Sequence, residues 1–141
     1  MPNSNNPRRH ANLILALLIP ASLACGIVQV SSNSGTITIT DLYTTGGLDA
    51  SGQPMEPDSE FETSQDRIYL VVTIDSPSPV PVGVRWFFGD ELIYEEATRV
   101  DNAAYWFIGP PPGQEFEVGS YHAEVYLVQD PVRSVDFVVV P

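Results

Sequence analysis

Short runs of alternating apolar and polar residues recur from about residue 36 to the end of the chain. Residues 36–43 alternate isoleucine with threonine, and residues 67–75 carry an apolar side chain at every second position. Residues 82–88 do the same around Trp86. A period of two is typical of strands with one buried face, and no apolar stripe of helical period is long enough for a substantial helix. The pattern therefore predicts an all-β domain.

Four more strands follow from the same alternation, which gives about seven in total. They cover residues 91–97, 103–108, 121–128 and 133–140. Gly89-Asp90 is a two-residue hairpin signal, and the run Gly-Pro-Pro-Pro-Gly at residues 109–113 ends a strand because proline has no amide hydrogen to donate. Residues 44–66 form a long loop rich in Gly, Ser, Asp and Glu, with a short edge strand expected at residues 60–63.

The placing of two aromatic residues resembles immunoglobulin-like and fibronectin-III-like domains. Trp86 lies inside the third main strand, and Tyr121, after Gly119-Ser120, enters the penultimate strand like the tyrosine corner of such domains. The resemblance implies an immunoglobulin-like antiparallel β-sandwich of about seven strands. The usual cysteine pair between the sheets is absent from the sequence, so packing alone must hold the sheets together.

The first 24 residues have the order of an export signal. Residues 1–10 are polar and carry Arg8 and Arg9, and residues 11–19 are apolar apart from Asn12. The 14 residues from Ala11 to Ala24 would span roughly 21 Å as a helix, whereas a bilayer core is about 30 Å thick. We therefore expect a signal-peptide helix rather than a stable membrane span.

The residues around the single cysteine, Ala21-Ser22-Leu23-Ala24-Cys25-Gly26, resemble the lipobox of bacterial lipoproteins. Ser22 departs from the commonest form, in which leucine stands three places before the cysteine, whereas Ala24 and Cys25 match. The resemblance implies cleavage after Ala24 and lipidation of Cys25, which anchors an exported chain in the cell membrane or envelope. The alternative is a plain secretory signal that leaves Cys25 unmodified. The expected organisation is a signal peptide at 1–24, a lipidated tether at 25–35 and a sandwich at 36–141.

Charge separates the two parts of the chain and limits the partners. All eighteen Asp and Glu follow Cys25, and with the four arginines that also follow it the mature net charge is −14. Such a surface repels phosphate backbones and anionic headgroups, which argues against nucleic acid as a partner. We expect contact with the lipid bilayer through acylated Cys25 and not through surface charge.

Candidate catalytic and metal-binding chemistry is sparse. His122 is the only histidine after Cys25, and we expect no enzyme activity and no cofactor, because a nucleophile and base pair would rest on this residue alone. The acidic residues Glu56, Asp58, Glu60 and Glu62 offer oxygen ligands for calcium, although they match no EF-hand spacing. The alternative is an acidic loop that keeps the protein soluble.

A candidate binding surface lies on the sheet face opposite the core. If Trp86 points inward, Phe87 and Arg85 point outward, and the same parity turns His122 and Tyr126 outward on a neighbouring strand. Phe87, Tyr126 and Arg85 would then form one exposed patch that binds a protein or a glycan. The alternative is that these aromatic residues only stabilise the sheet. On the strand at residues 103–108, two arrangements are possible: either Trp106 faces the core, or Tyr105 and Phe107 do.

The function expected from the sequence is a membrane-anchored, extracytoplasmic lipoprotein whose immunoglobulin-like domain is a binding module. The alternative is a structural or accessory subunit of a cell-envelope complex, in which the acidic domain docks on a basic partner. The remaining hypotheses for its function are a calcium-binding module and an enzyme.

Overall fold

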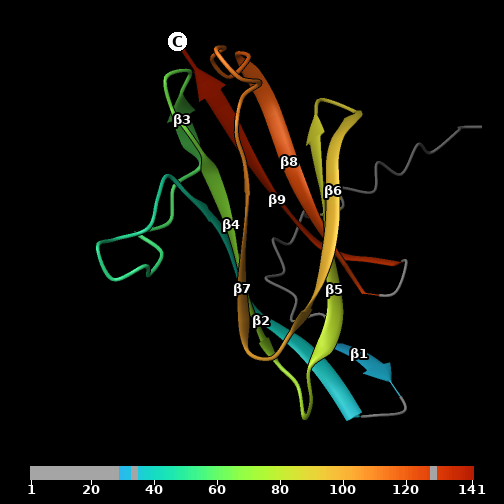
Figure 1. The fold of residues 1–141 in the computed structure, drawn as a ribbon. Helices are drawn as coiled ribbons and strands as arrows, with labels where there is room; N and C mark the ends of the chain where they lie inside the picture. Colours follow the sequence, from blue (N-terminus) through green and yellow to red (C-terminus); the bar gives the residue numbers. More distant parts are fainter. Residues whose placement is uncertain (1–28, 33–34, 128–129) are drawn as a thin grey trace, which may run out of the picture.

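The computed structural model describes residues 29–32, 35–127 and 130–141, which form two sheets packed face to face (Figure 1). The predicted signal peptide at residues 1–24 and the predicted lipidation site Cys25 lie outside the described residues. The strands are β1 (Gln29–Ser32), β2 (Gly35–Thr45), β3 (Glu60–Glu62), β4 (Ile68–Asp75), β5 (Val80–Phe88), β6 (Glu91–Val100), β7 (Ala103–Ile108), β8 (Gly119–Leu127) and β9 (Asp130–Val140).

One sheet has four strands in the order β1-β2-β4-β7, and the other has five in the order β3-β9-β8-β5-β6. All neighbouring strands are antiparallel except β3, which runs parallel to β9. In this order β7 and β6 are edge strands, one from each sheet. They follow each other directly in the chain through the turn at Asp101 and Asn102.

The all-β prediction is confirmed, and each of the seven predicted segments contains a strand. The edge strand expected at residues 60–63 is β3, which pairs with the last strand of the chain. Strand β1 was not expected, because residues 25–35 were interpreted as a tether. Its residues pair with the start of β2, from Gln29 opposite Thr38 to Ser32 opposite Gly35, so part of that segment belongs to the first sheet.

The core lies between the two inner faces, as the alternation predicts. Trp86 is fully buried, and its ring meets Phe137 edge-on at 6.2 Å between centroids. Tyr121 stacks on the same phenylalanine at 5.3 Å. Trp106 and Ile108 on β7 face the core, whereas Tyr105 and Phe107 face solvent, which settles the alternative that the sequence left open.

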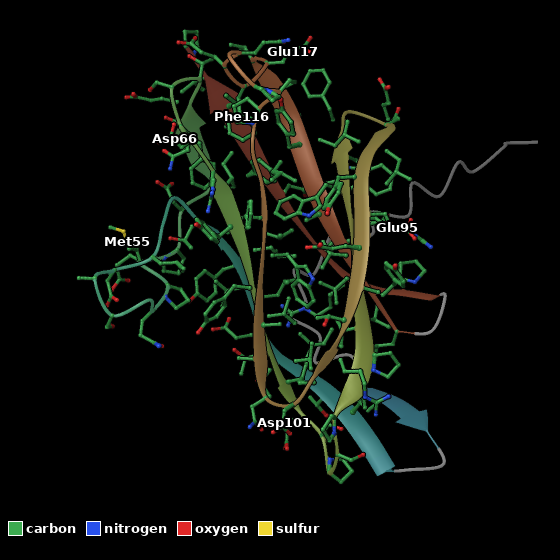
Figure 2. The ribbon with its side chains drawn as sticks, in the orientation of Figure 1. Met55, Asp66, Glu95, Asp101, Phe116 and Glu117 are labelled. Carbon is green, nitrogen blue, oxygen red and sulfur yellow. The ribbon has the colours of Figure 1, made fainter. Side chains whose placement is uncertain are left out.

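The sandwich has two distinct ends. Strand β1 and the turn between β6 and β7 lie at one end, and the loop that leads from β7 to β8 lies at the other (Figure 1). Figure 2 shows Asp101 at the first end and Phe116 and Glu117 at the second. Within residues 29–32, 35–127 and 130–141, no helix is long and apolar enough to cross a membrane.

Candidate functional site

The predicted patch of Phe87, Arg85 and Tyr126 lies on the outer face of the five-stranded sheet, as expected, but it is not one exposed surface. Phe87 is half-buried and stacks on His122, with ring centroids 4.4 Å apart and an interplanar angle of 5°. Tyr126 is only 6% exposed. The prediction of an exposed Tyr126 is therefore wrong, and Phe87 does not share an open patch with it.

The burial of Tyr126 has a local cause. Tyr126 pairs with Gly83 across β8 and β5, and a Cβ atom at Gly83 would lie 2.0 Å from the Cζ atom of the ring. The missing side chain leaves room for the ring to lie flat on the sheet. Arg85 covers the ring from above, with Cζ 4.3 Å from the ring centroid.

Glu95 completes this arrangement from β6. It accepts a hydrogen bond from the Tyr126 hydroxyl at 3.2 Å and from Arg85 Nε at 3.0 Å. Burial, and then the hydrogen bond to Glu95, raises the pKa of Tyr126. Arg85, Glu95 and Tyr126 thus bind one another across three strands, which favours a structural role for this part of the face.

His122 is engaged in the same way. Its ring stacks on Phe87, and its Nε2 atom lies 3.9 Å from the carboxylate of Glu124. These contacts hold the imidazole against the sheet beside an aromatic neighbour. The geometry is that of a cross-strand pair between β5 and β8.

The candidate calcium residues do not come together. Asp58 turns its carboxylate back to accept hydrogen bonds from the backbone amides of Ser59 and Glu60, at 2.7 and 3.1 Å. Glu60 and Glu62 are exposed on β3, on either side of the buried Phe61. In the described part of the chain, no three His, Cys, Asp or Glu side chains gather in a way that would hold a metal ion.

The long acidic loop is instead fixed to β2. The hydroxyl of Thr44 donates to the carbonyl of Asp58 at 2.6 Å, and the hydroxyl of Thr45 donates to the carbonyl of Glu56 at 3.0 Å. Both threonines are buried. These bonds satisfy the hydroxyl groups of two buried threonines and tie the end of the loop to β2.

A groove of about 640 Å³ lies between the edge strands β6 and β7, and sequence reasoning missed it. Figure 1 shows these strands separating from their shared turn towards the loop at residues 109–117, and residues of this loop also line the groove. Phe88, Ile108, Phe116 and Tyr121 contribute apolar surface, and Ile93 and Tyr94 line it from β6. Ile93 is 44% exposed and Tyr94 is 47% exposed.

A bulge in β6 places these side chains. Trp86 pairs with Tyr94, but the next residue, Phe87, pairs with Leu92, so Ile93 has no partner position on β5. Because Trp86 points into the core, Tyr94 opposite it also points to the inner side of the sheet. Leu92 lies opposite the outward-facing Phe87 and does not line the groove.

The loop above the groove is anchored from within. Gly113 has a φ of 75°, a left-handed conformation that favours glycine, and the amide of Gln114 bonds to the carbonyl of Pro111 at 3.0 Å. Phe116 then enters the core and meets Tyr121 edge-on. Its amide donates to the carbonyl of Thr63 at 3.1 Å.

Carboxylates surround the apolar part of the groove. Glu91 and Glu96 line it from β6, and Glu115 and Glu117 line it from the loop. The Tyr94 hydroxyl donates to Glu96 at 3.1 Å, and this hydrogen bond is the main cause that raises the pKa of Tyr94. The groove therefore combines apolar side chains with negative charge. In the sequence, the feature that could have indicated this groove is the apolar run Leu92-Ile93-Tyr94 between acidic residues.

Comparison with known proteins identifies the fold. No protein-family model and no curated protein matches the sequence. Among solved structures, the sandwich is similar to an immunoglobulin-like protein from Pseudomonas aeruginosa, with a TM-score of 0.56 and 8% identity over 77% of this chain and 100% of that chain. The chain has an immunoglobulin-like fold. An alkylpurine DNA glycosylase from Pseudomonas fluorescens, bound to DNA with an abasic-site analogue, matches with a TM-score of 0.47 and 13% identity over 74% of this chain and 30% of that chain.

Two features expected of an immunoglobulin-like domain are present. The hydroxyl of Tyr121 donates to the backbone carbonyl of Glu117 at 2.8 Å, four residues upstream, which is the bond of a tyrosine corner. Trp86 fills the centre of the core. The expectation of an immunoglobulin-like sandwich is confirmed.

Proposed function

We propose that the chain is an exported lipoprotein whose immunoglobulin-like domain binds another protein at the membrane surface and does not catalyse a reaction. The observation that carries this proposal is the groove between β6 and β7, where exposed Ile93 and Tyr94 lie among four glutamates. Exposed apolar side chains within a polar rim are typical of interaction sites. The contacts of His122 with Phe87 and Glu124 are those of a sheet face, which favours binding over acid–base chemistry.

The anchor part of the proposal rests on the sequence around Cys25. Cys25 stands four residues before Gln29, the first residue of β1, and four residues extend at most about 14 Å. A lipid on Cys25 would therefore hold the β1 end of the domain close to the bilayer. The loop between β7 and β8, which lines the groove, lies at the opposite end of the sandwich, so this part of the groove would lie away from the membrane (Figure 1).

Intact mass spectrometry of the membrane-extracted protein tests the anchor. We expect a mature chain that begins at Cys25 and carries added acyl mass, and we expect Cys25→Ala to lose both the mass and the membrane association. Two or more acyl chains would anchor the protein stably, because each buried CH₂ contributes about 0.8 kcal/mol. A mature chain that begins at Cys25 without acyl mass would show that the signal is a plain secretory one.

Photo-crosslinking in intact cells tests the binding role. A benzophenone amino acid at Tyr94 is expected to give a dominant crosslinked partner. The matched control is the same group at Met55, which is 55% exposed but lies in the loop away from the groove. Equal crosslinking from both positions, or none from Tyr94, would contradict a binding role for the groove.

An accessory subunit of an envelope complex is the second candidate, because the mature chain carries a net charge of −14 that favours a basic partner. Such a subunit should give one partner in a fixed ratio from every strain and growth condition. A free binding module should give a partner only when that partner is present, so the ratio separates the two candidates.

A further inference from the structure

The edge of β7 borders the groove with backbone groups that none of the described strands covers. Among the described strands, β7 pairs with β4 alone. Its six residues, Ala103–Ile108, contain no proline, so every residue keeps an amide hydrogen. An edge strand of this kind presents a row of backbone donors and acceptors that pair readily with another extended chain.

Within the residues that the structure describes, the inner side of β6 also has no strand facing it. Tyr94 and Glu96 lie opposite the inward-facing Trp86 and Val84 on β5, and Glu91 lies opposite Phe88. Yet Tyr94 is 47% exposed, since in the described part of the chain the opposite, four-stranded sheet ends at β7. A strand added beside β7 would extend the four-stranded sheet into the space that Tyr94 and Ile93 line.

The charge of the groove selects the kind of strand. Four glutamates line it, and the described lining residues include no arginine. Arg67 lies nearby, with its guanidinium 4.5 Å from the Phe107 ring centroid, but it is not one of the lining residues. An incoming segment therefore gains from cationic side chains beside the carboxylates and from apolar side chains against Ile93 and Tyr94.

We infer that the edge of β7 accepts an extended segment of a partner protein that carries both lysine or arginine and apolar side chains on the face turned towards β6. This inference rests on the proposed function and names the chemistry of its partner. A second copy of this chain fits poorly, because two domains of net charge −14 repel each other and only four arginines follow Cys25.

A synthetic peptide of about ten residues serves as the probe. Every second residue is threonine, and the positions between them alternate lysine and valine, so that one face of the extended peptide carries both side chains. The full mature chain in nonionic detergent is titrated into the fluorescein-labelled peptide, and anisotropy reports binding. We expect a dissociation constant on the order of 100 µM at low ionic strength, weakened by added salt. The same peptide with glutamate in place of lysine, and one with N-methylated amides along one edge, should bind at least about tenfold more weakly.

Two neighbouring residues provide matched variants. Ile93 and Leu92 are isomers of similar exposure, 44% and 48%, but only Ile93 lines the groove. Ile93→Ser should weaken peptide binding about five- to tenfold, whereas Leu92→Ser should leave it unchanged. Glu96→Gln should weaken binding and reduce its dependence on salt. Both Ile93 and Leu92 are on the surface, so neither change should unfold the domain.

Each alternative result overturns the inference. Failure of the lysine–valine peptide to bind, equal binding of the N-methylated peptide, or equal effects of Ile93→Ser and Leu92→Ser would do so. Dimerisation of the chain that Ile93→Ser abolishes would assign the groove to a second copy. If Tyr94 still crosslinks to a partner in cells while the peptide tests fail, the binding role stands and only the strand-addition chemistry is wrong.

Discussion

Gly83→Ala tests the account of why Tyr126 is buried. Gly83 is buried in the middle of β5, where alanine would normally stabilise a strand by about 0.5–1 kcal/mol. Here the new Cβ would lie 2.0 Å from Cζ of Tyr126 and 2.4 Å from its hydroxyl oxygen. The ring must leave its position, so we expect alanine to destabilise the domain.

The expected cost follows from what Tyr126 would lose. Its hydrogen bond to Glu95 contributes about 1 kcal/mol, and the contact with Arg85 about 0.5–1 kcal/mol because it lies near solvent. Exposure of a ring that is now 6% exposed costs roughly 1–2 kcal/mol more. After the intrinsic gain from alanine, we expect a net loss of about 2–3 kcal/mol, or roughly 10 °C in the melting temperature of a domain of this size.

A double-mutant cycle separates the ring from the backbone. In a Tyr126→Ala background the obstacle is gone, so Gly83→Ala should become neutral or slightly stabilising, measured by thermal unfolding followed by circular dichroism. Gly47→Ala is a control, since its Cβ would meet only the Met55 sulfur at 3.4 Å. If Gly83→Ala melts at or above the wild type, or costs the same without Tyr126, the explanation is refuted.

Two further predictions concern the core. Trp86→Ala should lower the free energy of unfolding by about 3–5 kcal/mol, and Trp86→Phe by only about 1–2 kcal/mol. The smaller loss is expected because the buried indole nitrogen meets no acceptor among the described residues, and phenylalanine removes that unpaired donor. Equal urea midpoints for the two variants would contradict this expectation. Tyr121→Phe should cost about 1 kcal/mol through its bond to Glu117. Burial raises the pKa of Tyr121 above its ordinary value of 10.0. The stability that the neutral tyrosine contributes is therefore full below pH 10.0 and is lost as the pH rises through the raised pKa. Between neutral and strongly alkaline pH, the free energy of unfolding should thus fall less for Tyr121→Phe than for the wild type.

The core was predictable from the sequence where alternation is unambiguous. On β8, Tyr121, Ala123 and Val125 alternate with His122 and Glu124, and on β5 Trp86 continues the alternation of Val82 and Val84; both strands lie inside the five-stranded sheet. On β7, Tyr105, Trp106 and Phe107 are all aromatic, so the period of two gave no direction for their side chains. Only the packing of β7 against the opposite sheet decides which of them is buried.

The exposure of Tyr126 was not predictable from alternation, because the period of two gives the direction of a side chain but not what covers it. The predicted outward direction of the Tyr126 side chain is correct, but Arg85 and Glu95 on two other strands contact its ring and hydroxyl and shield it from solvent. Gly83, between two valines in a strand, was the one available signal, since glycine at such a place often marks a close approach.

The groove was missed because it depends on a bulge and on the length of each sheet. Glu91 and Tyr94 are three residues apart, and a regular strand would place them on opposite faces, yet the bulge at Ile93 puts both on the inner side. Because Leu92, Ile93 and Tyr94 are all apolar, the sequence does not show where side chains of β6 change from one face of the sheet to the other. The open space further requires that β6 has no facing strand in the described part of the chain, which is a property of strand order and not of local sequence.

Strand β1 changes what an anchor at Cys25 would mean for the groove. With β1 paired to β2, three residues rather than ten separate Cys25 from the sheet. The link then spans at most about 14 Å, and the nine residues of β5 extend about 30 Å from that end to the groove. A lipid-anchored domain would hold its acidic groove within about 45 Å of the membrane surface. A partner of such an anchored domain would have to present its basic extended segment in that layer, which would favour a membrane-bound partner over a freely diffusing one.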